Sequence, residues 1–399
     1  MYPSRVYAPV PAVPSAEDLF SSALSNLFTD DTQTHHGVPG QSVYYDSPHF
    51  GRLSLRIPEH PDAAEGRSLF AYNLWNGGVV AADAIEEGSN GPLPPSQSGT
   101  GQDTHEENHA TWNNRYWSVR GKSVLELGAG AALPSIIAAL SGAKSVAITD
   151  HPTSTALTMG AIEQSIGHNL HVISTSSEEP GTDTATPITD KTTLDDVASH
   201  TAARYTYTRR QEQQQSQAEE ASSSSSSTKR KTDTEISIYG YTWGTTTFYL
   251  PNTYGKPTPD QPGSFQRIII AECLWMPDQH VNICKTILSY LSGDDAEGDP
   301  SCALVVAGFH TGREILRQFF EVATGEFTLA AQNEEKAAAA DDDDDDDDTE
   351  TRAVRGRLKA VDMFEIDVNG VRRPWASKRP GEDKHMAMRW CVCAVLVRR

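Results

Sequence analysis

The sequence predicts an α/β fold in which a mostly parallel sheet is covered by helices on both faces. Three observations lead to this prediction: apolar strand-like runs alternate with helix-like runs, a glycine turn follows the first such strand, and an aspartate ends the second. This alternation is typical of parallel sheets, because each crossover needs a connection long enough for a helix. Ligands of such sheets bind at the carboxyl ends of the strands. We therefore expect the chemistry of this chain in the segments that directly follow its strands.

The individual elements are inferred from hydrophobic periodicity and from start and stop residues. Pro134 near the start of one apolar run and Gly142 just past its end favour a helix between them. The predicted helices are residues 134–141, 153–168, 278–291 and 312–322. The predicted strands are, in chain order, residues 122–128, 145–150, 236–241, 267–273, 303–309, 327–331 and 389–398.

Three stretches have compositions that do not support a packed core. Residues 87–110 are rich in Gly, Pro, Ser and acids, residues 174–234 contain Gln and Ser runs, and residues 333–351 contain eight consecutive aspartates. Such compositions bury too little apolar surface to offset the entropy lost on ordering. We expect disordered insertions here, within one domain over residues 69–399 that follows an N-terminal segment, residues 1–68.

The charge and the cysteines exclude several classes of partner. The formal net charge of −21 repels phosphate backbones, so we expect no nucleic-acid partner. No run approaches the roughly 20 apolar residues of a membrane helix, and no signal-peptide core is visible, so we expect a soluble monomer without a membrane partner. The five cysteines form no CxxC pair, which favours core packing over a metal site and fits a reduced, cytoplasmic setting.

The glycine turn and the aspartate together predict a nucleoside site. Residues 124–134 read VLELGAGAALP, an apolar strand that runs into Gly128 and Gly130 and then into a helix. Glycines allow a tight turn and let a ligand approach the backbone closely. Asp150 ends the next strand, where a carboxylate can accept both ribose hydroxyls of a nucleoside. Either feature alone is also compatible with an ordinary strand-to-helix turn or a helix cap.

Two ligands compete for this site, a nicotinamide dinucleotide and S-adenosylmethionine. The dinucleotide fingerprint needs a small third residue, whereas Leu133 stands there, and Pro134 removes an amide that a diphosphate would use. Glu126 stands just before the turn, where an anion would repel a diphosphate and suit the cationic methionine end of S-adenosylmethionine. We therefore favour the methyl donor over the dinucleotide.

Four stretches of the chain resemble one known family. They are residues 17–28 (EDLFSSALSNLF) followed by Asp30, Asp31 and His36, residues 69–78 (LFAYNLWNGG), residues 124–134, and residues 270–280 (IAECLWMPDQH). On these stretches the chain is similar to the fungal N-terminal and lysine methyltransferases of elongation factor 1-alpha, a branch of the seven-strand lysine methyltransferases that older naming placed with nicotinamide N-methyltransferases. The second and fourth stretches are the specific ones. The chain departs from the family pattern at Asn73, Gly77 and Ala132, where Tyr, Ala and Gly are usual.

The resemblance implies a Rossmann-like, seven-stranded class I methyltransferase sheet that binds S-adenosyl-L-methionine. Carried over residue by residue, it implies cofactor contacts from Trp75, Gly128, Ala129, Gly130, Asp150, Trp243 and Ala271. The charge argument adds Glu126 to this cofactor site. Glu272 is our catalytic hypothesis, in which its carboxylate orients the incoming amine beside Trp275. No metal ligand is implied.

Each of these residues also has a purely structural interpretation. Trp75 and Trp243 are large enough to be core residues, Asp150 can cap the helix that follows it, and Glu272 can be an ordinary strand-end carboxylate. His280 is expected to cap or pack and not to catalyse.

The resemblance implies a protein N-methyltransferase that acts on the N-terminal amine and an adjacent lysine of elongation factor 1-alpha. The alternative is a methyltransferase of a small amine of the nicotinamide type. A dinucleotide-dependent oxidoreductase is disfavoured by Leu133 and Glu126. A binding protein with an inactive methyltransferase fold is disfavoured by the intact glycines and Asp150, but the transfer of an activity from a fold rests on analogy.

Overall fold

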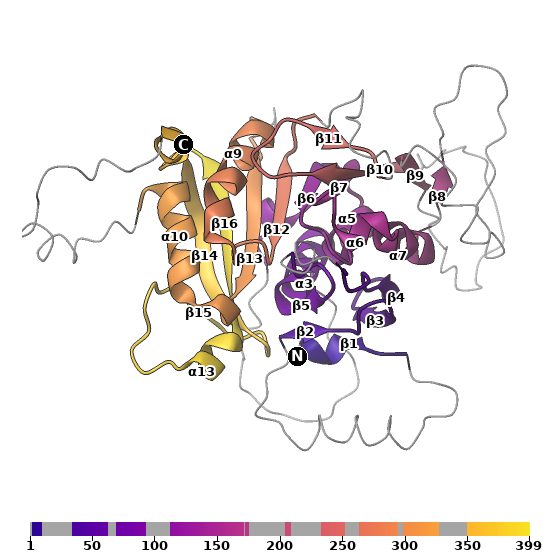
Figure 1. The fold of residues 1–399 in the computed structure, drawn as a ribbon, viewed down its shortest axis with the longest axis horizontal. Helices are drawn as coiled ribbons and strands as arrows, with labels where there is room; N and C mark the ends of the chain where they lie inside the picture. Colours follow the sequence, from indigo (N-terminus) through magenta and orange to yellow (C-terminus); the bar gives the residue numbers. More distant parts are fainter. Residues whose placement is uncertain are drawn as a thin grey trace, which may run out of the picture.

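The computed structural model describes residues 2–9, 34–62, 69–92, 112–170, 172–174, 204–208, 233–251, 263–293, 298–326 and 349–399. A large mixed sheet forms the centre of the molecule (Figure 1), and its strands follow the order β15–β14–β16–β13–β12–β6–β7–β10–β9–β8. The strands of this sheet are β6 (Ser123–Leu127), β7 (Ser145–Asp150), β8 (Val172–Ser174), β9 (Arg204–Thr208), β10 (Asp233–Tyr241), β12 (Arg267–Ala271), β13 (Cys302–Gly308), β14 (Leu358–Asp367), β15 (Arg372–Pro374) and β16 (Trp390–Arg398), with β11 (Phe248–Tyr249) paired to β10.

The central strand order confirms the predicted fold class. Strands β10, β7, β6, β12 and β13 run parallel to one another, and β16 runs antiparallel between β13 and β14. The chain starts at β6, builds outward through β7 and β10, and then crosses to β12 on the other side of β6. Strand order therefore reverses next to β6, which is where such sheets bind their ligands.

Helices cover both faces of this sheet. The main ones are α3 (Asn76–Asn90), α5 (Leu133–Leu140), α7 (Ala161–Asn169), α9 (His280–Tyr290) and α10 (Arg313–Thr324). Helices α3, α5 and α7 bury their apolar side chains in one hydrophobic cluster, and α9 and α10 in a second. Successive residues of each central strand alternate between these clusters, as Ile268, Ile269 and Ile270 do in β12. The parallel strands are therefore apolar on both faces.

The described residues of the N-terminal segment pack onto the body formed by the large sheet and its helices. Strands β1 (Val6–Tyr7), β3 (Ser42–Ser47) and β4 (Gly51–Arg56) form an antiparallel sheet. Its β4 backbone is hydrogen-bonded to α7, with Arg56 N–H donating to Ser165 Oγ and Ser54 N–H donating to Asn169 Oδ1. A short strand pair, β2 (His35–His36) with β5 (Leu74–Trp75), then leads the chain into α3.

Most of the predicted elements are confirmed, and a few differ. The predicted helix over residues 153–168 is broken into α6 (Thr155–Thr158) and α7, because Gly160 takes a left-handed conformation with φ of +69° between them. The predicted strand 327–331 and the resemblance over 17–28 lie outside the described residues. The strand beside β16 is β14, which the sequence analysis did not predict.

The boundaries of the predicted insertions also need correction. Residues 87–90 are the end of α3, β9 and the start of β10 lie inside the range 174–234, and residues 349–351 begin α12 (Thr349–Val354). These pieces are ordered by pairing and packing with the core, which composition does not reveal. Within the described part of the chain, every helix is too short or too polar to cross a lipid bilayer.

Helix α3 owes its place to close backbone approaches. Most of its residues are buried, although its sequence NGGVVAADAIEEGSN contains three glycines, which weaken its local helix signal. A Cβ added at Gly88 would lie 2.6 Å from the Cβ of Trp117 and 3.0 Å from the Trp117 backbone carbon. The indole of Trp117 is itself fully buried at the end of α4 (Asn114–Trp117). Gly88 therefore lets α3 and α4 touch.

Replacement by alanine should change the stability of the protein in opposite directions at Gly88, which touches Trp117, and at Gly167, which has open space around it. Gly88→Ala should lower the free energy of unfolding by about 1–3 kcal/mol, because backbone atoms must shift to admit the new methyl group. Gly167→Ala in α7, where an added Cβ meets nothing within 4 Å, should raise it by up to about 1 kcal/mol. Urea denaturation of both variants checks this. Equal effects of the two substitutions would contradict the packing described here.

Candidate active site

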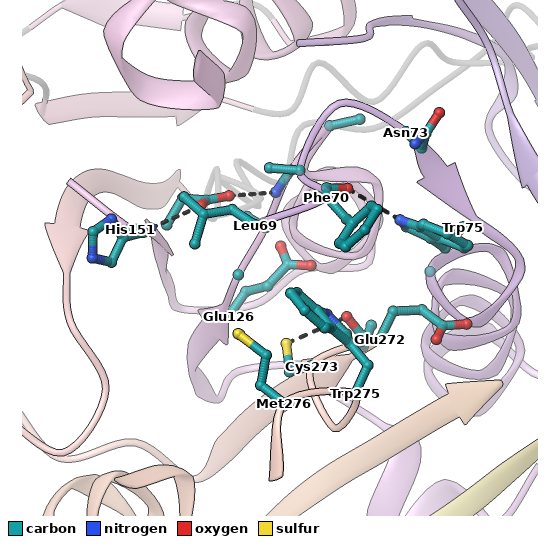
Figure 2. A pocket seen from close by; sticks show the side chains of 18 of the residues that line it. Leu69, Phe70, Asn73, Trp75, Glu126, His151, Glu272, Cys273, Trp275 and Met276 are labelled. Atoms are coloured by element: carbon teal, nitrogen blue, oxygen red, sulfur yellow. Dashed lines mark hydrogen bonds between the residues drawn. The ribbon is translucent and has the colours of Figure 1, made fainter. Parts of the chain in front are cut away.

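A cavity opens at the carboxyl ends of β6, β7, β10 and β12, where strand order reverses, and residues 69–75 form its opposite wall. All nine side chains or backbone positions predicted as site residues line it: Trp75, Glu126, Gly128, Ala129, Gly130, Asp150, Trp243, Ala271 and Glu272. Figure 2 shows the labelled part of this wall, with Glu126 between the side chains of segment 69–75 and those that follow β12. The three stretches of the resemblance that the structure describes, residues 69–78, 124–134 and 270–280, meet here.

The glycine turn leaves room for a ligand because both of its glycines have positive φ, +62° at Gly128 and +53° at Gly130. A Cβ on Gly128 would lie 3.1 Å from the sulfur of Cys273 and 3.3 Å from Trp243, so a side chain there would fill the cavity. The backbone of the turn is held from behind, with Ala129 N–H donating to the Thr149 carbonyl at 2.9 Å. The turn is therefore a rigid and open cradle.

Asp150 closes the turn from the neighbouring strand. Its Oδ2 accepts a hydrogen bond from Gly130 N–H at 2.8 Å, and its Oδ1 accepts one from His151 N–H at 2.7 Å. The carboxyl group is only 4% exposed, and burial raises its pKa. The Ser154 hydroxyl also interacts with this carboxyl group, and the lone pairs that remain suit ligand hydroxyls. The helix-cap interpretation is excluded, because Ser154 caps α6 by accepting from Ala156 N–H.

Glu126 is a nearly fully buried part of the cavity wall, and its burial bears on the charge that we assigned to it from the sequence. Its Oε2 accepts from both the backbone N–H and the hydroxyl of Ser135 in the first turn of α5. The side chain is 2% exposed, and burial raises its pKa to about 8. Burial therefore favours the protonated form of this carboxyl group in the ligand-free protein, whereas the charge argument from the sequence treated it as an anion. A cation bound beside it would favour the ionised form.

Glu272 is held by two elements. Its Oε1 accepts from Gly77 N–H at 2.9 Å at the start of α3, and its Oε2 accepts from Gly308 N–H at 3.1 Å at the end of β13. In Figure 2 its carboxylate extends away from Glu126. A Cβ at Gly77 would lie 2.4 Å from Oε1, so a larger residue there would require the Glu272 side chain to move. These contacts support the structural interpretation of Glu272, while its role in orienting an amine stays a prediction.

Aromatic side chains surround the mouth of the cavity. The Trp75 Nε1–H donates to the Phe70 carbonyl at 3.2 Å, and the Phe70 ring meets Trp275 edge-on at 5.1 Å between centroids. His310 stacks on the outer side of Trp75 at 4.9 Å, and Phe70 is 41% exposed. The mouth is therefore an open aromatic rim, typical of a site that accepts a side chain or a chain end.

Backbone strain gathers at this cavity. Among the described non-glycine residues, Phe70, Ala132 and Glu272 have positive φ, at +49°, +59° and +59°. Phe70 and Glu272 line the cavity, and Ala132 is the N-cap of α5, directly after the glycine turn. Such conformations cost about 1–3 kcal/mol each and persist where the surrounding structure enforces them. Two of the three thus lie in the cavity wall and the third lies next to it.

Several residues that line the cavity were not predicted from the sequence, although they lie within the stretches that carry the resemblance. Phe70 and Asn73 lie inside the stretch LFAYNLWNGG, and Met276 and Gln279 inside the stretch that follows β12. His280 does not line the cavity: its buried ring packs edge-on against Phe319 and its Nε2 lies 2.8 Å from the Leu274 carbonyl, which confirms the prediction that it packs. The five cysteines are free and buried, also as predicted.

The strand order defines a Rossmann-like α/β fold, and the paired glycine turn and carboxylate lie in the cavity at its strand ends. No family model matches the chain. Two solved structures resemble it weakly: a putative S-adenosylmethionine-dependent methyltransferase from Streptococcus mutans (TM-score 0.37, 8% identity, 96% of this chain and 65% of that chain) and a putative methyltransferase complexed with S-adenosylhomocysteine (TM-score 0.36, 7% identity, the same coverage).

The sequence is similar to fungal proteins named protein N-terminal and lysine N-methyltransferase EFM7. The identity is 35% over 101 residues for the Schizosaccharomyces pombe protein, covering 24% of this chain and 29% of that protein. It is 31% over 112 residues for Candida albicans (27% and 33%) and 33% over 118 residues for Aspergillus fumigatus (30% and 29%). The matches thus span about a third of the length of these curated relatives. They confirm the resemblance predicted from the sequence.

The burial of Glu126 predicts a pH dependence of stability. Its pKa rises from 4.5 in the exposed state to about 8 in the folded protein, so the folded state holds a proton that the unfolded chain has lost. Stability should therefore fall as the pH rises from 4.5 through 8, by up to about 3 kcal/mol between pH 5.5 and 8.5. Glu126→Gln should remove this part of the decline while keeping the contacts to Ser135. Urea denaturation at both pH values checks this, and parallel curves for the two proteins would contradict it.

Proposed function

We propose that this chain is an S-adenosylmethionine-dependent protein N-methyltransferase. The observation that carries the proposal is the buried Asp150 carboxylate, which is bonded to the Gly130 amide and faces an open glycine cradle with lone pairs to spare. A methyl donor with a ribose and a cationic sulfur fits this cradle better than a dinucleotide, because Pro134 and the first turn of α5 offer few free amides for a diphosphate. The names of the fungal relatives point to the same activity.

We infer that the cofactor is held by residues at the carboxyl ends of β6, β7, β10 and β12. Asp150 is suited to the ribose hydroxyls, and the backbone of Gly128–Gly130 to the sugar and the amino-acid portion. Trp243 offers a flat wall and Met276 an apolar one for the adenine. A cationic group bound beside Glu126 would lower the pKa of its carboxyl group and favour the ionised form. The bound cofactor supplies an activated methyl group on a positively charged sulfur.

The protein's contribution is to orient a neutral amine at the mouth of the cavity. A lysine amine has a pKa of about 10.4 and an N-terminal amine one of about 7.7–8.0, so each must lose a proton before it reacts. The aromatic walls of Phe70, Trp75 and Trp275 remove water and so favour the neutral form, and they also receive an incoming ammonium group through cation–π contact. Fixed orientation of two reactants contributes roughly 7–11 kcal/mol at best.

For the substrate, we propose the N-terminal amine and an adjacent lysine of elongation factor 1-alpha, methylated by a monomeric enzyme in the cytoplasm. The exposed aromatic rim supports a protein substrate, since a chain end can reach it from outside. The test incubates the full chain and labelled methyl donor with purified, unmethylated elongation factor 1-alpha or with nicotinamide. We expect label on the protein, mapped by mass spectrometry to its N-terminus. Label on nicotinamide alone would overturn the proposal.

Asp150 is predicted to govern cofactor affinity. Asp150→Ala should weaken binding of S-adenosylhomocysteine at least about tenfold, because hydrogen bonds to a charged group contribute about 1.5–3 kcal/mol. Asp150→Asn should have a smaller effect, since it keeps an acceptor for Gly130. Asp46→Ala is the control, as it removes an exposed carboxylate on β3 outside the cavity. Calorimetric titration checks this, and unchanged affinity in Asp150→Ala would exclude the ribose assignment.

Glu272 is predicted to act on turnover and not on cofactor affinity. Glu272→Gln keeps an acceptor oxygen for only one of the two amides, that of Gly77 or that of Gly308, and removes the charge that our hypothesis places beside the amine. We expect kcat to fall about tenfold or more, with affinity for S-adenosylhomocysteine within about twofold of the original protein. Steady-state kinetics and calorimetry check this. An equal loss of both quantities would show that Glu272 only holds α3 against β13.

A further inference from the structure

A second hollow lies in the segment that joins β14 to β16. Its walls come from Arg373, Lys378, Arg379 and Arg389, together with Glu382 and the apolar side chains of Met386 and Trp390. Between residues 372 and 389 the chain has six lysines and arginines but only two acids, whereas the whole chain has a net charge of −21. We call this feature the basic hollow.

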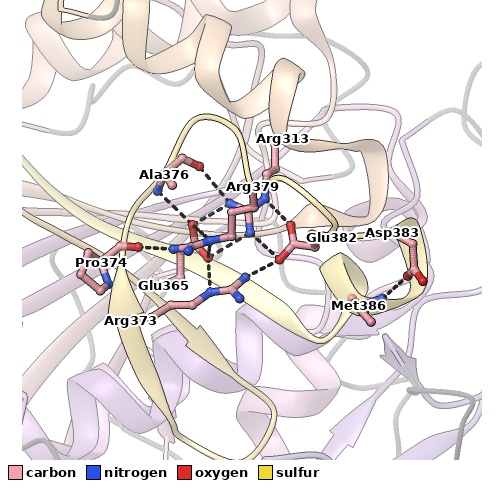
Figure 3. A network of polar contacts seen from close by, with 9 residues as sticks. All are labelled: Arg313, Glu365, Arg373, Pro374, Ala376, Arg379, Glu382, Asp383 and Met386. Atoms are coloured by element: carbon pink, nitrogen blue, oxygen red, sulfur yellow. Dashed lines mark hydrogen bonds and ion pairs between the residues drawn. The ribbon is translucent and has the colours of Figure 1, made fainter.

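A buried network gives the basic hollow a fixed shape. The fully buried carboxylate of Glu365 on β14 accepts from Arg313 at 2.6 Å, from Arg373 at 2.6 Å and from Arg379 at 3.1 Å. Glu382 accepts from Arg313 and Arg373, so the two carboxylates bind three arginines (Figure 3). Because the network contains more positive than negative charges, it neutralises its acids and leaves the segment basic.

Three further cations of this segment stay available to a partner. Lys378 and Lys384 are exposed and Arg389 is half-buried, and none of them forms an ion pair within the described residues. Lys378 and Arg389 line the basic hollow, and Lys384 opens the short helix α13 (Lys384–Met388) beside it. Met386 on the same helix is 54% exposed. The surface therefore combines free positive charge with a small apolar contact area.

The basic hollow lies next to the mouth of the candidate active site. Helix α13 packs against the short helix η3 (Phe309–Thr311), and His310 of η3 stacks on Trp75 at the cavity mouth. Arg313 follows η3 by two residues and binds the network of the hollow. Since β14 runs parallel to β13, the segment after β14 emerges at the same edge of the sheet as the cavity. A protein that presents an amine to the mouth would reach the basic hollow.

We propose that the basic hollow docks an acidic stretch of the protein substrate beside the amine that is methylated, an inference that rests on the proposed function. An acidic polypeptide fits better than a nucleic acid for two reasons. The net charge of −21 repels an extended polyanion away from this segment, and Met386 and Trp390 offer apolar contacts that suit side chains. Complementary charge at such a surface raises the association rate and selects the partner.

The test reverses the free charges and compares two matched variants. Lys378→Glu/Lys384→Glu/Arg389→Glu changes the basic hollow. Lys144→Glu/Arg357→Glu/Lys359→Glu makes the same change in charge at exposed positions beside the opposite, amino-terminal ends of β7 and β14. With purified elongation factor 1-alpha as substrate, we expect the first variant to raise KM about tenfold or more with kcat within about twofold. The second should leave both nearly unchanged. The exposed pair Lys378→Glu/Lys384→Glu serves if the triple variant does not fold.

The outcomes separate the two proposals. Equal KM values for both triple variants would overturn the docking surface and leave the methyltransferase proposal intact. If the original protein transfers no methyl group, the proposed function fails, and a direct binding assay then decides about the basic hollow alone. In that assay, fluorescence anisotropy of a labelled ten-residue aspartate peptide should show salt-sensitive binding to the original protein and to the control variant, and none to the variant of the hollow. Stronger binding of a labelled RNA than of the peptide would also overturn the inference.

Discussion

The hydrogen bond from the Gly130 amide to the Asp150 carboxylate is the interaction on which the candidate site depends. It joins the turn after β6 to the end of β7, so it ties together the two strand ends beside the reversal point of the sheet. Because the carboxylate is buried and bonded to backbone on both oxygens, its orientation is set before any ligand arrives. The aromatic rim and the strained backbone at Phe70 and Glu272 are then arranged around this fixed pair.

The part of the fold predicted well from the sequence is the part determined by local chemistry. Strands β6, β7, β12 and β13 are apolar runs buried on both faces, and a glycine turn needs glycine whatever surrounds it. Most of the predicted site residues reach one cavity because they lie at or just after the carboxyl ends of parallel strands, which meet at one edge. Trp75 reaches the cavity from the opposite wall, at the end of β5. The charge state of Glu126 was not predictable from the motif, since the burial that raises its pKa depends on packing against α5.

The elements that the sequence analysis missed depend on distant partners. Strand β14 has charged residues at positions that prove to be buried, and Glu365 is tolerated there because arginines from three other segments surround it. A bulge between Ala360 and Asp362 also breaks its alternation. Helix α3 combines three alanines and two glutamates with three glycines, which weaken its local helix signal. Two of these glycines, Gly77 and Gly88, lie against Glu272 and Trp117, which are distant in the sequence.

The most direct test of the account is which nucleotide the ligand-free protein retains. Equilibrium dialysis of the full chain against S-adenosylhomocysteine and, separately, against a nicotinamide dinucleotide measures this without any assumption about the substrate. The account predicts one equivalent of S-adenosylhomocysteine bound per chain and no retention of the dinucleotide. Retention of the dinucleotide by folded protein that does not bind S-adenosylhomocysteine would contradict it.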